Sequence, residues 1–92
     1  MNKSILITGA SGGIGSEIAS QASQQGYKVG LLDLNEEKLA ELESEIPNST
    51  ALPTDVTDED SVAETLEKFN EIPSALVNCA GIVRFGSLLE QE

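Results

Sequence analysis

The chain has 92 residues with 16 acidic, five basic and no histidine side chains, which gives a formal net charge of −11. This length fits one small domain, and the acidic balance disfavours a nucleic-acid partner because its phosphates would be repelled. No apolar run approaches the ~18 residues of a membrane span, so we expect no membrane partner. The N-terminus lacks the pattern of a secretion signal. With no histidine and one cysteine, Cys79, a disulfide or a metal site is disfavoured and a cytoplasmic location is predicted.

The first elements along the chain are a strand and a helix. Residues 3–8 form a short run with a continuously apolar centre at 5–7, which is typical of a strand buried on both faces. Residues 13–25 carry apolar side chains four apart, which predicts an amphipathic helix. Gly26 stands where the C-terminal cap of that helix is expected.

A second strand and helix follow in the same order. Residues 28–32 are predicted to form a buried strand that ends at Asp33. Asn35 is a suitable N-cap for a helix over 36–45. Pro47 ends that helix. Many of the acidic residues lie here and in 58–71, where we interpret them as solvated helix faces.

The last predicted elements are weaker. Residues 50–53 predict a short third strand, and Thr57 or Asp58 can cap a helix that runs to about Phe69. Residues 75–77 begin a fourth apolar strand. Strands and helices therefore alternate throughout, which predicts an α/β fold: a parallel, doubly wound sheet with helices on both faces.

Glycines gather between the first strand and the first helix, at Gly9, Gly13 and Gly15. A helix N-terminus carries unpaired N–H groups and a partial positive charge, so it attracts anions. Glycines there let the backbone approach a pyrophosphate and let the helix pack closely on the strand. The segment therefore predicts a binding site for the diphosphate of a dinucleotide.

Asp33 supports the same interpretation, because it ends the second strand 18 residues after Gly15. A carboxylate at that position can accept hydrogen bonds from both ribose hydroxyls of adenosine. The alternative is a tight strand-to-helix turn with an exposed aspartate and no ligand.

Three motifs resemble those of the short-chain dehydrogenase/reductase family. "TGASGGIG" at 8–15 is similar to the family's TGxxxGxG fingerprint, and "DV" at 55–56 is similar to its pair after the third strand. "NCAG" at 78–81 is similar to its NNAG motif, with Cys79 in place of the second Asn. The resemblance covers essentially all 92 residues. It implies a Rossmann-type sheet of order 3-2-1-4, here truncated after the fourth strand.

The resemblance implies a nicotinamide dinucleotide cofactor and oxidation or reduction of a small-molecule alcohol or carbonyl substrate. Ser11, Gly13 and Ile14 would meet the pyrophosphate and the adjacent ribose, and Asp33 would hold the adenosine ribose. The implied cofactor-binding residues are Gly9, Ser11, Gly12, Gly13, Ile14, Gly15, Asp33, Leu34, Asp55, Val56, Asn78, Ala80 and Gly81. Asp55 and Val56 would border the adenine.

The cofactor is expected to be NAD rather than NADP. A ribose 2′-phosphate would be repelled by Asp33. NADP-preferring relatives usually place a basic residue near the phosphate turn or just after the second strand, and this chain has Gly12 and Leu34 there.

The resemblance also implies a catalytic Ser, a Tyr-x-x-x-Lys pair and an Asn, which would all lie beyond Glu92. Tyr27 is the only tyrosine and is followed four residues later by Leu31, so we interpret it as a packing residue and assign no catalytic residue. We also expect Cys79 to be a buried packing residue. The chain is thus expected to be the N-terminal part of one dinucleotide-binding domain in a longer, dimeric or tetrameric enzyme.

Two alternatives stay open at this point. The chain is a non-catalytic nucleotide-binding module that is complete at 92 residues, or it is an acidic interaction domain without a ligand. The second leaves the glycine spacing and Asp33 without a cause.

Overall fold

The computed structural model describes residues 3–69 and 73–79. Their helices and strands are β1 (Ser4–Thr8), α1 (Gly13–Gln24), β2 (Lys28–Asp33), α2 (Glu36–Glu45), β3 (Ser49–Pro53), α3 (Glu59–Phe69) and β4 (Ala75–Asn78). The predicted alternation of strands and helices is confirmed, including the weak third strand.

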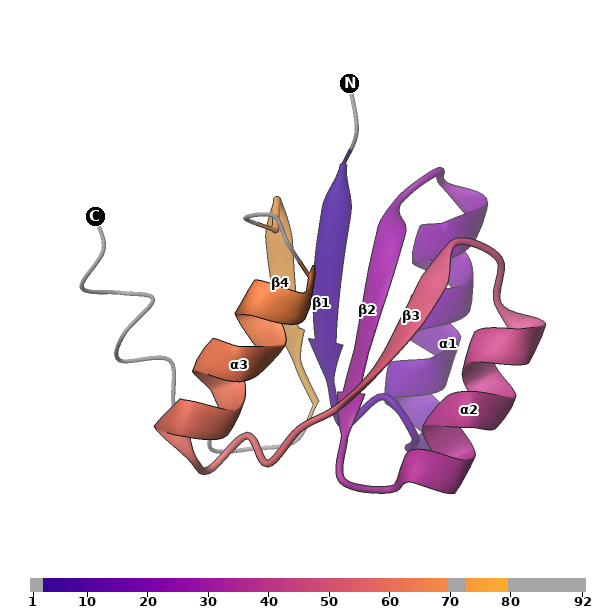
Figure 1. Cartoon of the computed structure of the whole chain (residues 1–92). Coiled ribbons are helices and arrows are strands. Elements are labelled where there is room, and N and C mark those ends of the chain that lie inside the picture. Colours follow the sequence, from indigo (N-terminus) through magenta and orange to yellow (C-terminus); the bar gives the residue numbers. More distant parts are fainter. Residues whose placement is uncertain (1–2, 70–72, 80–92) are drawn as a thin grey trace.

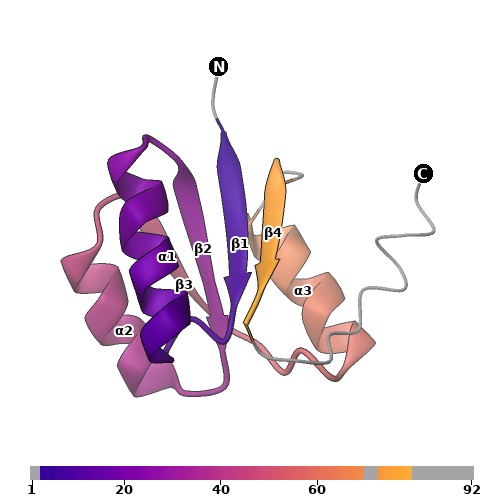
Figure 2. The ribbon, with the colours of Figure 1, turned by 180° about the vertical axis from the view of Figure 1, so that it is seen from behind.

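The strands form one parallel sheet in the order β3-β2-β1-β4. Helices α1 and α2 cover one face and α3 covers the other (Figures 1 and 2). The chain steps outward from β1 to β3 and then crosses to the far side of β1 for β4. Ligands of doubly wound sheets bind at the carboxyl ends of the strands beside such a reversal of strand order, which here lies between β1 and β4.

The core has two layers, one on each face of the sheet. The layer under α1 and α2 is built around Ile5, Ile7, Val29, Leu31 and Leu39. The layer under α3 is built around Leu6, Leu32, Leu52 and Phe69. Every residue of β1 is buried, because successive side chains point alternately into the two layers. This double burial explains why the centre of β1, Ile5 to Ile7, is continuously apolar rather than alternating.

The helix ends show the capping that the sequence predicts. The Asn35 side chain accepts a hydrogen bond from the N–H of Lys38 at 3.1 Å. Gly26 has φ +90°, and the N–H of Tyr27 donates to the carbonyl of Ala22 at 3.1 Å. This left-handed turn closes α1 as a Schellman motif and redirects the chain into β2.

The two edges of the described sheet differ. The N–H of Ala51 on β3 donates to the Glu43 carboxylate at 2.7 Å, so a side chain of α2 occupies that edge. On β4, burial alternates along the strand and Leu76 is 42% exposed. No helix in the described parts of the chain is long and apolar enough to cross a membrane.

Gly30 in the middle of β2 leaves room for the α3 layer. A Cβ there would collide with Leu6, and it would lie 3.1 Å from atoms of both Leu52 and Phe69. Inserting a carbon into a packed core usually costs about 1–3 kcal/mol, so we expect Gly30→Ala to lower the free energy of unfolding by that amount. Urea denaturation followed by circular dichroism measures it.

The matched control is Gly13→Ala, because a Cβ at Gly13 meets no atom within 4 Å. This variant should unfold at the wild-type urea concentration or slightly above it. Equal stability of Gly30→Ala and wild type would contradict the packing described for β2.

Candidate functional site

The loop between β1 and α1 lies at the carboxyl edge of the sheet, the lower edge in Figure 1. Its glycines have separate physical reasons. Gly9 has φ +66°, a conformation that side chains disfavour. A Cβ on Gly15 would collide with the carbonyl oxygen of Gly9, so Gly15 allows α1 to lie directly against the end of β1. A Cβ on Gly13 would meet open space, so the backbone there is accessible to a ligand.

The N-terminus of α1 differs from those of the other helices. Its N-cap residue, Gly12, makes no side-chain cap hydrogen bond, and its first turn holds no acidic residue. In contrast, Asn35 caps α2, and the Asp58 carboxylate accepts from the N–H of Asp60 at 2.9 Å at the start of α3. The first turn of α1 therefore presents a partial positive charge that no side chain of the helix neutralises.

Asp33 closes the site from the end of β2. Its Oδ2 accepts hydrogen bonds from the Ser11 N–H at 3.2 Å and from the Ser11 hydroxyl at 2.7 Å. Its Oδ1 accepts from the Asn35 N–H at 3.2 Å. The N–H of Ala10 donates to the carbonyl of Leu32 at 3.2 Å, so the glycine loop is fastened to β2 through both backbone and side chain.

These contacts set the ionisation of Asp33. Partial burial raises the pKa of the carboxyl, but the hydrogen bonds from Ser11, Asn35 and Leu34 outweigh it and hold the pKa below its ordinary value. The carboxylate is therefore charged at neutral pH and lies beside the start of α1.

The other side of the site is formed by the ends of β1 and β4. The buried Thr8 hydroxyl donates to Asn78 Oδ1 at 2.8 Å, and the Cys79 N–H donates to Thr8 Oγ1 at 3.1 Å and to the Thr8 carbonyl at 3.2 Å. Thr8 therefore joins the glycine loop to the "NCAG" segment. Sequence reasoning placed Thr8 in the fingerprint but gave it no role; a hydroxyl at the end of a buried strand was the available signal.

The prediction that Cys79 packs inside the protein is wrong, since its side chain is exposed. Cys79 follows the last residue of β4, where the chain leaves the sheet, and it is anchored through its backbone rather than its side chain. Ala80 and Gly81, the next two predicted site residues, lie outside the described residues.

The segment after β3 lies at the same edge of the sheet. Asp55 Oδ1 accepts from the Thr57 hydroxyl at 2.6 Å and from the Thr57 N–H at 3.0 Å. Those bonds lower the pKa of Asp55 despite a small opposing effect of burial. Val56 packs against the core layer under α3. The Asp55 carboxylate therefore orders the loop to which it belongs.

Two large apolar side chains are exposed at this edge. Ile14 in the first turn of α1 is 74% exposed and Leu34 after β2 is 70% exposed. Removing large apolar side chains from water is favourable in free energy. These two side chains flank the uncapped amides and Asp33. They are suited to contact the apolar faces of a bound ligand.

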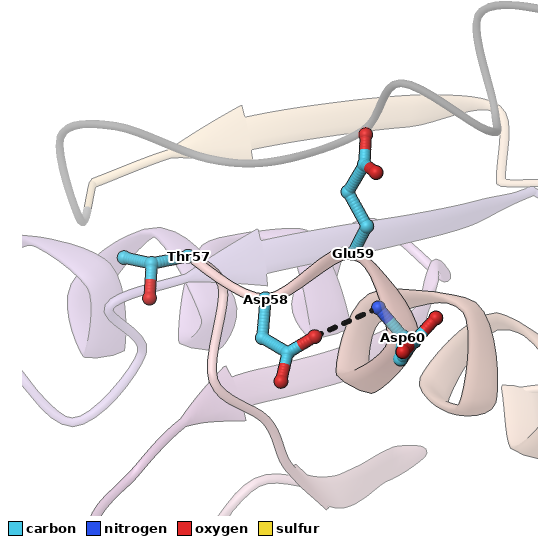
Figure 3. Close-up of a pocket in the computed structure, with 4 residues that line it drawn as sticks. All are labelled: Thr57, Asp58, Glu59 and Asp60. Carbon is cyan, nitrogen blue, oxygen red and sulfur yellow. Dashed lines mark hydrogen bonds between the residues drawn. The ribbon is translucent and has the colours of Figure 1, made fainter.

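A separate shallow hollow lies at the start of α3 and is lined by Thr57, Asp58, Glu59 and Asp60 (Figure 3). Three of its four lining side chains are acidic, so it repels phosphate. The start of α1 is the more suitable of the two places for an anion.

The model of the family described as short chain dehydrogenase matches residues 3–92. The chain belongs to this short-chain dehydrogenase family. Its parallel sheet of order 3-2-1-4 with helices on both faces is the Rossmann-type fold that the three motifs imply.

Curated relatives of this short-chain dehydrogenase chain are oxidoreductases. The zebrafish (Danio rerio) dehydrogenase/reductase SDR family member 6 is 37% identical over 98% of this chain and 36% of its own length. The 3-oxoacyl-[acyl-carrier-protein] reductase of Staphylococcus epidermidis is 36% identical over 100% of this chain and 41% of its own length. The chain thus spans about two fifths of the length of these relatives.

A solved structure has the same fold. The crystal structure of a 3-oxoacyl-[acyl-carrier protein] reductase with bound NAD from Brucella melitensis superposes with a TM-score of 0.80 and 29% identity, covering 92% of this chain and 34% of that one.

The lowered pKa of Asp33 predicts a pH dependence of stability. A carboxyl whose pKa is lower in the folded than in the unfolded state contributes stability that is complete above about pH 4 and is lost as the pH falls through the folded pKa. Asp33→Asn should therefore lose less stability than wild type when the pH falls from about 5 to about 2.5. Urea midpoints measured across this range test the prediction, and parallel curves for the two proteins would contradict it.

Proposed function

We propose that this chain is the dinucleotide-binding part of an oxidoreductase that transfers hydride between NAD and a small alcohol or carbonyl substrate. The observation that carries the proposal is the uncapped first turn of α1 beside the ionised Asp33. In this proposal, residues 1–92 are the N-terminal part of a single dinucleotide-binding domain.

The diphosphate of NAD would lie on the backbone around Gly12, Gly13 and Ile14. The two phosphates would be attracted there, because the amides of a helix N-terminus point outward with a partial positive charge. The space beside Gly13 is free of protein atoms, and Gly9 and Gly15 supply the turn and the close packing that bring these amides to the edge of the sheet.

The adenosine half of NAD would lie toward β2 and β3. A carboxylate at Asp33 accepts hydrogen bonds from ribose hydroxyls and repels a 2′-phosphate, which favours NAD over NADP. Leu34, Asp55 and Val56 stand at the same edge of the sheet and would border the adenine, where the exposed Leu34 side chain offers apolar contact.

The nicotinamide half would lie on the β4 side of the loop, past Ile14. Asn78 is held there by the Thr8 hydroxyl, and we propose that Asn78, Ala80 and Gly81 line this part of the cofactor path. NAD itself supplies the hydride chemistry.

Proton transfer needs a group whose pKa lies near the working pH, and we assign no residue of this chain to that role. The proposal is that Ser, Tyr and Lys side chains from a longer chain supply it, in a cytoplasmic dimer or tetramer.

Calorimetric titration with NAD and NADP tests the proposed specificity. Wild-type protein should bind NAD at least about tenfold more tightly than NADP, a difference of about 1.4 kcal/mol. Asp33→Asn should reduce the preference for NAD over NADP, because the charge that repels the 2′-phosphate is removed. The matched control is Asp60→Asn, which removes one charge at the hollow beside α3 and should leave the ratio unchanged.

If the wild-type protein bound NADP as tightly as NAD, the proposed preference for NAD would be wrong. The enzyme activity is tested on the intact protein by following NADH absorbance with secondary alcohols. A non-catalytic nucleotide-binding module would bind NAD and form no NADH.

Gly13→Ala separates ligand binding from folding in the glycine loop. A Cβ at this position projects into open space, which in this proposal the diphosphate fills, so NAD affinity should fall about tenfold, equivalent to ~1.4 kcal/mol. The urea midpoint should stay at the wild-type value or rise slightly. Unchanged NAD affinity in Gly13→Ala would show that the diphosphate does not use this backbone.

A further inference from the structure

The Asp33 carboxylate already has most of its hydrogen-bonding capacity in use. Oδ2 accepts from both the N–H and the hydroxyl of Ser11, and Oδ1 accepts from the N–H of Asn35. The Leu34 N–H is a further donor that lowers the pKa of Asp33. A carboxylate offers about four acceptor positions, so these bonds leave at most one. The adenosine ribose of NAD offers two hydroxyl donors, which is more than the free carboxylate can receive.

At least one of these donors must therefore move if both ribose hydroxyls are to bind Asp33. The N–H of Ser11 is fixed by the loop, which is tied to β2 through the Ala10–Leu32 hydrogen bond. The N–H of Asn35 is fixed at the start of α2, where Asn35 is the N-cap. Only the Ser11 hydroxyl is on a side chain that can rotate away without moving the backbone.

We propose that Ser11 is a specificity-determining residue. In the free protein its hydroxyl occupies the acceptor position on Asp33 that a ribose hydroxyl takes in the complex, and the ribose hydroxyl displaces it on binding. This inference rests on the proposed function. In the free protein the Ser11 hydroxyl keeps the carboxylate oriented toward the glycine loop. In the complex, the ribose takes over the acceptor, so the second ribose hydroxyl adds less affinity than a vacant carboxylate would give.

The consequence is measurable with ADP and 2′-deoxyADP, which differ only in one ribose hydroxyl. In wild-type protein, ADP should bind only slightly more tightly than 2′-deoxyADP, because the extra hydroxyl of ADP replaces an existing hydrogen bond. In Ser11→Ala the acceptor is vacant, and one net hydrogen bond should raise the preference for ADP by roughly 2- to 10-fold.

Two further variants serve as controls in the same titrations on the intact protein. Ser11→Thr keeps a hydroxyl at this position and should keep the wild-type ratio. Ser44→Ala removes an exposed hydroxyl at the far end of α2, where it donates to the carbonyl of Glu41 at 2.7 Å, and should also leave the ratio unchanged.

An independent readout is the titration of the Asp33 carboxyl by NMR in the free protein. The Ser11 hydroxyl is one of the groups that lower the pKa of Asp33, so that pKa should rise in Ser11→Ala and not in Ser44→Ala. A merely structural role for Ser11 would change stability without changing the ADP preference.

The outcomes are distinct. A larger ADP preference in Ser11→Ala, with Ser11→Thr like wild type, supports the proposal. An unchanged or smaller preference in Ser11→Ala, with ADP still bound by the wild type, overturns the displacement of Ser11 and leaves the proposed function standing. Failure of the wild-type protein to bind ADP and NAD overturns both.

Discussion

The close approach of α1 to the end of β1 is the constraint on which the rest of the site depends. Gly15 has no side chain to hold the helix away from the Gly9 carbonyl, so the first turn of α1 lies at the carboxyl edge of the sheet. There it meets the ends of β2 and β4, which bring Asp33 to one side of the loop and Asn78 to the other. A larger residue at position 15 would shift the uncapped amides relative to both.

The molecule is strongly acidic and yet has a site suited to a diphosphate. The acidic residues of α2 and α3 lie on exposed helix faces, and mobile ions screen charges beyond a Debye length of about 8–10 Å. Within that distance the local arrangement decides. The first turn of α1 presents backbone N–H groups and holds no acidic residue, and the one acid beside it, Asp33, accepts hydrogen bonds from Ser11. The start of α3 has the opposite arrangement, with acids at its first two positions, Glu59 and Asp60.

Much of this fold could be predicted from the sequence because its signals are local. The continuously apolar centre of β1 indicated a strand buried on both faces. Asn35 and Gly26 marked helix ends through side-chain and backbone properties of single residues. The glycine spacing and Asp33 are also local signals, and the structure brings the glycine loop and Asp33 together at one edge of the sheet.

The rest depends on contacts between residues far apart in sequence. The Ser11–Asp33 pair is separated by 22 positions and the Thr8–Asn78 pair by 70, so no local pattern shows them. Cys79 was expected inside because no His or Lys lies near it in sequence to make its thiol reactive, but its backbone makes the structural contact and its side chain is exposed. The tie between Asp55 and Thr57 is local, yet sequence reasoning considered that aspartate only as a neighbour of adenine.

The most direct measurement is backbone amide mapping by NMR during titration with NAD. We expect the largest changes in chemical shift at the amides from Ser11 to Gly15, with a second group at Asp33 and Leu34. Changes concentrated instead at 57–60, at the start of α3, or spread evenly over the surface would contradict a diphosphate bound at the first turn of α1.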